Sequence, residues 1–169
     1  MSIFIEKLQM NDLEILYKFE IENQAFFEKT VPSRGDAYYQ FENFKEIYTC
    51  LLEEQVAKAS YFYLIKNEHG DILGRINLTD INKSQKTGSL GYRIGRASSG
   101  KGIAQKALHL LIKQAKSLGV ETIRAKTTDN NLASQKVLTN HNFEEIKIND
   151  ETVELNGVTR TFVHYILVV

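Results

Sequence analysis

Apolar and polar residues alternate at the start of the chain in a pattern that predicts a strand followed by a helix. IFIEKL (3–8) alternates with a period of two, as a half-buried strand does. Asn11 and Asp12 follow, two residue types that often cap helices, and apolar residues then recur at helical spacing from Leu13. The same spacing over 41–59 predicts a second amphipathic helix, and the aromatic stretch 23–39 between them is predicted to be irregular.

The rest of the chain is predicted to alternate strands with helices. Apolar residues at helical spacing begin at Ile103 and stop at Gly119, which is typical of a helix that ends at a glycine. Gly70 and the pair Asn156 and Gly157 mark tight turns between strands. Strands are predicted at 61–66, 72–81, 87–94, 121–127, 143–148 and 161–169, with a short helix at 131–140.

These elements predict an α/β fold in one domain that covers residues 1–169. We expect a mixed, mostly antiparallel sheet of about seven strands with about four helices. The 43% hydrophobic and 25% charged content of the 169 residues lies in the range of one well-packed globular domain.

Charge and cysteine content narrow the class of protein. Lys and Arg total 21, as do Asp and Glu, so no global field favours nucleic acid or an anionic membrane. The single cysteine, Cys50, cannot form an internal disulfide, and the first residues lack the build of a secretion signal. No apolar run reaches the roughly 20 residues of a membrane span. We therefore expect a cytoplasmic protein with no membrane and no direct nucleic-acid partner.

The stretch GRASSGKG (95–102) lies between a predicted strand and a predicted helix, where backbone N–H groups and the helix dipole favour an anion. A nucleoside-triphosphate loop would need Ser or Thr after Lys101 to hold Mg²⁺, and Gly102 stands there instead. Two interpretations stay open: a structural turn, or a loop that holds a diphosphate without metal, as in coenzyme A. No metal is expected, because metal-ligand spacing is missing among His69, His109, His141 and His164.

Two blocks of the sequence resemble the GNAT N-acetyltransferases. GKGIA (100–104) resembles the acetyl-CoA signature of that family, and NLASQKVLTNHNF (131–143) resembles the segment after its fifth strand. EIENQAFFEKTVPSR (20–34) and NGVTRTFVHY (156–165) resemble the branch that acetylates the N-termini of ribosomal proteins. The resemblance spans nearly the whole chain.

The resemblance implies a GNAT-like domain and an acetyl-CoA-dependent N-acetyltransferase. Acetyl-CoA is then the co-substrate, and the acceptor is a primary amine, foremost the N-terminal α-amine of a ribosomal protein. Ser134 is implied to hydrogen-bond the departing sulfur, with Tyr92 as the other catalytic candidate. Coenzyme contacts are implied for Tyr92, Arg93, Ile94, Ser99, Gly100, Lys101, Gly102, Ile103, Ala104, Asn131 and Ser134. The chain is expected to be a monomer or a homodimer.

Several positions depart from the family pattern. Seven residues after Asn131 some relatives have a Tyr that acts as general acid, and here the position is Leu138, which leaves Ser134 beside the sulfur. The fourth strand also lacks the carboxylate that many relatives place there. A water relay through Tyr92, Asp80 or a carboxylate of the last hairpin stays open as the base. The other departures are Ser89, Leu90, Ser99, Lys106, Asn142 and Thr161.

Other interpretations remain beside the N-terminal acetyltransferase. One is an acetyltransferase for small amines such as polyamines, antibiotics or metabolites, and another is a non-catalytic acyl-CoA-binding regulator. Residue by residue, Asn131 can simply cap its helix and Tyr92 can simply pack in its strand. The aromatic side chains between the first two helices either belong to the core or shape the acceptor cleft.

Overall fold

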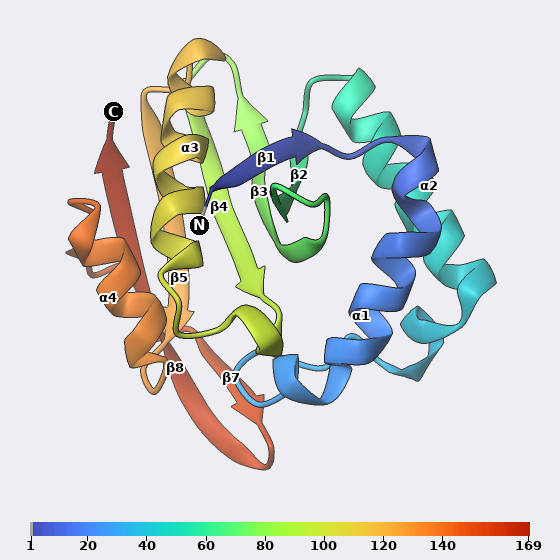
Figure 1. Cartoon of the computed structure of the whole chain (residues 1–169). Helices are drawn as coiled ribbons and strands as arrows, with labels where there is room; N and C mark the ends of the chain where they lie inside the picture. The colour runs from blue at the N-terminus through green and yellow to red at the C-terminus, as the bar shows by residue number, and fades with distance from the viewer. Residues whose placement is uncertain (1) are drawn as a thin grey trace.

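Eight strands, four α-helices and three short 3-10 helices make up residues 2–169, the part of the chain that the computed structural model describes (Figure 1). The strands are β1 (Ile3–Lys7), β2 (Tyr61–Asn67), β3 (Ile72–Asn82), β4 (Thr87–Ile94), β5 (Thr122–Thr128), β6 (Glu144–Ile146), β7 (Thr152–Leu155) and β8 (Val158–Val168). The α-helices are α1 (Leu13–Phe27), α2 (Phe41–Val56), α3 (Ile103–Ser117) and α4 (Leu132–Asn140). The 3-10 helices are η1 (Met10–Asp12), η2 (Asp36–Tyr39) and η3 (Arg96–Ser98).

The sheet is mixed, and one of its strand pairs is mostly open. The strands lie in the order β1-β2-β3-β4-β5-β8-β6, with β7 paired to β8 outside this path. Neighbours are antiparallel except β4 and β5, which are parallel and pair only over three residues, from Thr87 to Ser89 on β4. β4 stays paired with β3 as far as Ile94. The sheet therefore separates on the β5 side of β4 while it stays closed on the β3 side.

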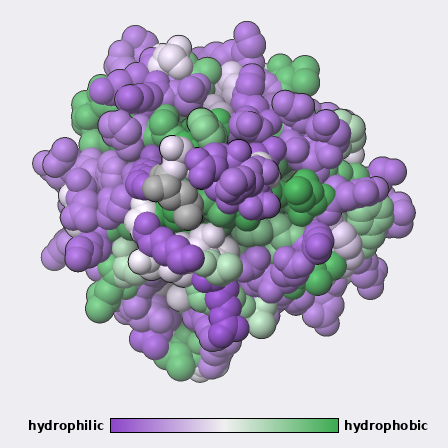
Figure 2. Space-filling view, viewed as in Figure 1, coloured by the Kyte–Doolittle hydropathy of each residue, from purple (hydrophilic) through white to green (hydrophobic). Residues whose placement is uncertain are grey.

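Two hydrophobic clusters cover the two faces of the sheet. Tyr63 of β2 belongs to the cluster under α3 and α4, and the next residue, Leu64, belongs to the cluster under α1 and α2. This alternation follows from the two-residue period of a strand. Figure 1 shows α3 crossing one face of the sheet, with α1 and α2 beyond β1. From the same side the molecular surface is mostly hydrophilic, with scattered hydrophobic side chains (Figure 2).

A buried ion cluster joins α1 to the middle of the sheet. Glu20 of α1 is fully buried and accepts hydrogen bonds of 2.6 Å from Arg75 of β3 and Arg93 of β4. Burial alone would raise the pKa of Glu20, but the two guanidinium groups outweigh it and hold that pKa below its usual value of 4.5. The carboxylate is therefore ionised at neutral pH and holds two adjacent strands to one helix.

The structure confirms the predicted α/β fold and corrects some element boundaries. Asn23–Phe27, predicted to be irregular, continues α1, because the Asn23 side chain donates to the Phe19 carbonyl one turn earlier and Phe27 is buried. The strand predicted at 143–148 covers only Glu144–Ile146. Phe143 instead donates its N–H to Leu138 and closes the end of α4. The structure also contains one strand more than the seven predicted, the short strand β7.

Replacing Glu20 tests how far the fold depends on this cluster. Glu20→Gln leaves two buried arginines without a counter-charge, so we expect a loss of about 3–5 kcal/mol in the free energy of unfolding. The exposed Glu22, on the same helix, is the matched control: Glu22→Gln should change this free energy by less than about 0.5 kcal/mol. Urea unfolding with circular dichroism measures both.

The lowered pKa of Glu20 also predicts that the contribution of this residue to the free energy of unfolding depends on pH. Because the folded-state pKa of Glu20 is lowered, its contribution is fully present above about pH 4.5 and is lost as the pH falls through the folded value. The stability advantage of the unmodified chain over Glu20→Gln should therefore shrink below pH 4.5. A difference that stays constant from pH 7 to pH 3 would show that the carboxylate charge contributes nothing.

Candidate active site

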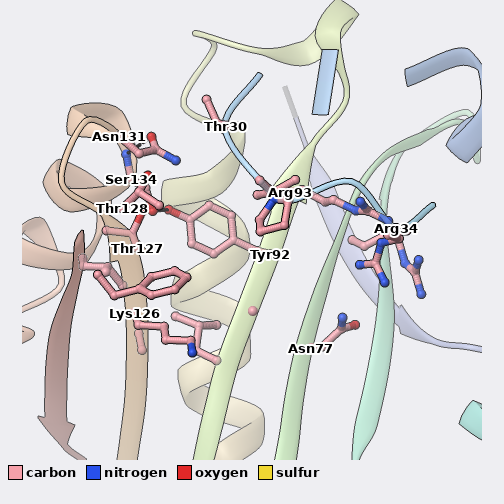
Figure 3. Close-up of a pocket in the computed structure, with 18 residues that line it drawn as sticks. Thr30, Arg34, Asn77, Tyr92, Arg93, Lys126, Thr127, Thr128, Asn131 and Ser134 are labelled. Atoms are coloured by element: carbon pink, nitrogen blue, oxygen red, sulfur yellow. Dashed lines mark hydrogen bonds between the residues drawn. The ribbon is translucent and has the colours of Figure 1, made fainter. Parts of the chain in front are cut away.

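A cleft of about 410 Å³ lies where β4 and β5 separate. β3, β4, β5, α4, β8 and the segment after α1 all contribute to its wall (Figure 3). The lining residues are Thr30, Val31, Pro32, Arg34, Arg75, Asn77, Leu90, Gly91, Tyr92, Arg93, Ala125, Lys126, Thr127, Thr128, Asn131, Ser134, Leu138 and Phe162. Four of the residues predicted for the site, Tyr92, Arg93, Asn131 and Ser134, thus meet in one cavity.

Tyr92 and Ser134 lie side by side in this cleft. Their hydroxyl oxygens are 3.0 Å apart, and Figure 3 shows the Tyr92 ring reaching from β4 toward the start of α4. Burial raises the pKa of Tyr92, and the hydrogen bond with Ser134 opposes this only in part. The phenol is therefore protonated at neutral pH and remains a hydrogen-bond donor.

Asn131 positions Ser134 by capping α4. Its Oδ1 accepts a hydrogen bond of 3.2 Å from the Ser134 backbone N–H, as an N-cap side chain does. The plain capping interpretation of Asn131 therefore describes a contact that is present. Any contact of Asn131 with a coenzyme stays a prediction.

The glycine-rich stretch forms a loop that enters α3. Gly100 and Gly102 have φ angles of 72° and 75°, and a Cβ built on either would meet nothing within 4 Å. Gly95 is required for a different reason, because a Cβ there would come within 2.9 Å of Phe19 on α1. The Asn23 side chain of α1 also accepts a hydrogen bond of 2.8 Å from the Arg96 N–H. Helix α1 thus fixes the start of the loop. Further along, at Gly100 and Gly102, the space beside the loop main chain is unfilled.

The other predicted coenzyme residues occupy three kinds of position. Ser99 turns back on the loop, where its hydroxyl donates to the Gly95 carbonyl over 3.2 Å. Ile103 is buried in the core and Ile94 packs against it, so only their main chains are available to a ligand. The Arg93 side chain bonds Glu20, and its main-chain carbonyl lies against Gly74 of β3, so neither faces the β5 side. Lys101 is exposed and Ala104 is half-buried at the start of α3. Their roles stay predictions.

The positive charge of the cleft was not predicted from the sequence. Its ionisable lining residues are Arg34, Arg75, Arg93, Lys126 and Tyr92, and no Asp or Glu is among the described residues that line it. Lys126 is paired with Glu151 of the last hairpin at 2.7 Å. Asp80, one of the predicted relay carboxylates, is exposed and lies outside the lining. The signal in the sequence was Arg75 and Asn77, two polar residues at alternate positions of the otherwise apolar stretch from Ile72 to Leu78 of β3.

Within 2–169, no group of three or more His, Cys, Asp or Glu side chains is arranged to hold a metal ion. Over the same residues, none of the helices combines the length and the apolar character that crossing a membrane requires.

Comparisons with known proteins agree with the fold. The sequence profile of the acetyltransferase (GNAT) domain matches residues 3–144. A probable N-acetyltransferase of Bacillus subtilis, YjcK, is 29% identical over 160 residues, which are 93% of this chain and 88% of the relative.

Solved structures with the same fold belong to acetyltransferases that are named for different acceptors. Ribosomal-protein-S5-alanine acetyltransferase from Vibrio fischeri matches with a TM-score of 0.90 and 19% identity over 99% of this chain and 93% of that one. Spermidine N-acetyltransferase from Vibrio cholerae, in complex with CoA and spermine, matches with a TM-score of 0.82 and 15% identity over 98% and 95%. At these identities the likeness concerns the fold.

The family match covers well over half of the chain and includes the glycine-rich loop, the cleft strands β4 and β5, and α4. It confirms the family that the two sequence blocks predicted. The chain belongs to the GNAT acetyltransferase family and is an N-acetyltransferase enzyme.

Proposed function

We propose that the protein transfers the acetyl group of acetyl-CoA to the α-amine at the N-terminus of a peptide or protein, with ribosomal proteins as the natural class of acceptor. The observation that carries this proposal is the positive charge of the cleft, from Arg34, Arg75 and Arg93. Positive charge repels a polyamine, whose amines are cationic, and it also disfavours the ammonium form of any acceptor amine. The fold, which a ribosomal-protein alanine acetyltransferase shares, is compatible with this acceptor.

The loop before α3 fits the pyrophosphate of acetyl-CoA. The positive φ angles and open surroundings of Gly100 and Gly102 let a phosphate approach the main chain closely. The backbone N–H groups of Ile103 and Ala104, in the first turn of α3, would donate to it, and Lys101 adds a positive charge. Once bound, acetyl-CoA supplies an acetyl group activated as a thioester.

We propose that Tyr92 and Ser134 act together to protonate the departing sulfur. Ser134 lies in the first turn of α4, where the helix dipole also favours negative charge. In the proposed arrangement Tyr92 would donate to Ser134, and the Ser134 hydroxyl would donate to the sulfur. The β4 main chain from Tyr92 to Ile94, unpaired on the β5 side, offers N–H groups to the acetyl oxygen.

The chemistry of the amine explains how an α-amine can react without a carboxylate base. An α-amine with a pKa of about 7.8 costs roughly 1 kcal/mol to deprotonate at pH 7, whereas a lysine side chain near 10.4 costs about 4.6 kcal/mol. The described lining residues include no carboxylate that could offset the larger cost. Lysine side chains are therefore expected to be poor acceptors.

An acceptor screen tests the proposal. We expect acetyl-CoA turnover with peptides that carry a free α-amine to exceed turnover with spermidine and with α-blocked lysine peptides. kcat/KM should rise along a single limb near pH 7 to 8, because the titrating group is the acceptor's own amine. Thiol release and mass spectrometry of the product measure both. Preference for spermidine would end the N-terminal assignment.

Placing a carboxylate in the loop should remove acetyl-CoA binding. Acetyl-CoA at 100 times its Kd should stabilise the unmodified chain by about 2.7 kcal/mol, and Gly102→Asp should lose this stabilisation. Gly119→Asp is the matched control, because Gly119 also has a positive φ with nothing within 4 Å but follows the other end of α3. Both variants carry the same backbone strain, so only a difference in the acetyl-CoA thermal shift reports the loop.

Removing the two hydroxyls should lower the rate. A charge-assisted hydrogen bond to the sulfur, made mainly in the transition state, is worth about 1.5–3 kcal/mol, so Ser134→Ala should lower kcat by about 10 to 150-fold with little change in the KM for acetyl-CoA. If Tyr92 acts through Ser134, adding Tyr92→Phe to Ser134→Ala should cost little more. Multiplicative losses would mean that the two residues act separately. Unchanged kcat in Ser134→Ala would remove Ser134 from the mechanism.

A further inference from the structure

We propose that the acceptor carries a carboxylate close to its reactive amine, and that Arg34, Arg75 and Arg93 bind this group. The occupant that fits is an N-terminal peptide with Asp or Glu as its second residue. This inference rests on the proposed function, because it specifies which α-amines the same cleft selects.

The positive charge of this part of the cleft exceeds what the protein neutralises. Glu20 is the carboxylate bonded to Arg75 and Arg93, so one negative charge serves two guanidinium groups. Arg34 adds a third cation, and within residues 2–169 it forms no ion pair. Burial, together with Arg34 and Arg75, lowers the pKa of Arg93 despite its bonds to Glu20. The three arginines therefore repel one another, and a bound anion would relieve the repulsion.

The arginines form one connected surface on the α1 side of the sheet. Arg75 and Arg93 are register partners on β3 and β4, and both face Glu20. Tyr38 links Arg34 to this pair, because the Arg34 guanidinium lies 5.1 Å from the Tyr38 ring centre and the Tyr38 hydroxyl interacts with Arg75. Figure 3 shows Arg34 and Arg93 on the same side of the cleft, away from Ser134.

The next pair along the same two strands leaves room for the acceptor main chain. Asn77 and Gly91 are register partners. Asn77 comes two residues after Arg75 on β3, and Gly91 comes two residues before Arg93 on the antiparallel β4. A Cβ on Gly91 would meet nothing within 4 Å, so the sheet is not covered there. The side-chain oxygen of Asn77 is shielded from solvent yet finds no hydrogen-bond donor among the described residues. A buried acceptor of this kind is costly unless a ligand donates to it.

The spacing of the two pairs matches an acidic N-terminus. Two residues along a strand span about 7 Å, which separates the Asn77 row from the arginine row. An extended peptide places the carboxylate of its second residue at a similar distance from its terminal nitrogen. The peptide amine would then donate to Asn77, which lines the same cleft as Tyr92 and Ser134, while the carboxylate meets the arginines.

Three peptides that differ only at their second residue test the inference. For Ala-Glu, Ala-Gln and Ala-Lys peptides we expect kcat/KM to fall in that order, with Glu exceeding Gln by about 10 to 150-fold, the range of a charge-assisted hydrogen bond. The Glu preference should weaken at high salt. The acetylated product peptides, measured as equilibrium ligands, should show the same order of Kd without any catalytic step.

Charge reversal at the rim supplies the matched variants. Arg34 is exposed, so Arg34→Glu should fold, and it should reduce the Glu-to-Lys preference by about fivefold, the upper end of the range for a surface ion pair. Arg124→Glu makes the same charge change on β5 at an exposed residue outside the cleft, and it should leave the preference unchanged.

The outcomes separate the two proposals. Equal turnover of the three peptides, or a preference for Lys, overturns the acidic acceptor while the α-amine function stands. A rise in the KM for acetyl-CoA in Arg34→Glu with no change of peptide preference would assign the arginines to the coenzyme and overturn it as well. If no peptide is acetylated but a small amine is, the proposed function itself is wrong.

Discussion

The bond between Glu20 and two arginines is the interaction on which the site depends. It fixes α1 against β3 and β4, the two strands that form one wall of the cleft. The same helix carries Phe19 and Asn23, which contact Gly95 and Arg96 at the start of the glycine-rich loop. One buried carboxylate therefore positions both the β3–β4 wall of the cleft and the entry to the loop. Its strength comes from low polarity around it, since burial makes each charge costly to leave unpaired.

The separation of β4 from β5 gives this arrangement its opening. Because side chains alternate along a strand, Tyr92 reaches Ser134 while the adjacent Arg93 reaches Glu20. A single strand thus contributes a hydroxyl to one half of the cleft and a cation to the other. Between them the main chain of β4 remains paired only to β3, so its second edge is available to a ligand.

Local patterns predicted the elements, whereas long-range pairings had to be seen. The two-residue and helical periods located most strands and helices, and Gly100 and Gly102 adopt the positive φ angles that glycines in a tight loop favour. Glu20, by contrast, is a charged residue on the buried face of α1 with Leu13 and Leu16, and nothing local indicates its partners 55 and 73 residues away. The contact of Tyr92 with Ser134, 42 residues apart, depends on the same tertiary placement. Family resemblance named those two residues but not their pairing.

In the proposed mechanism, the positive charge of the cleft lowers the pKa of the acceptor amine and so replaces part of the function of a general base. A single uncompensated cation about 7 Å from an ammonium, at an effective dielectric of 20, disfavours it by about 2.4 kcal/mol, or roughly 1.7 pKa units. That shift brings an α-amine below pH 7 but leaves a lysine side chain mostly charged. Glu20 leaves two of the three positive charges without a counter-charge, and the carboxylate of an acidic acceptor would neutralise one of them. The other would continue to favour the neutral amine, so binding and deprotonation need not compete for the same charge.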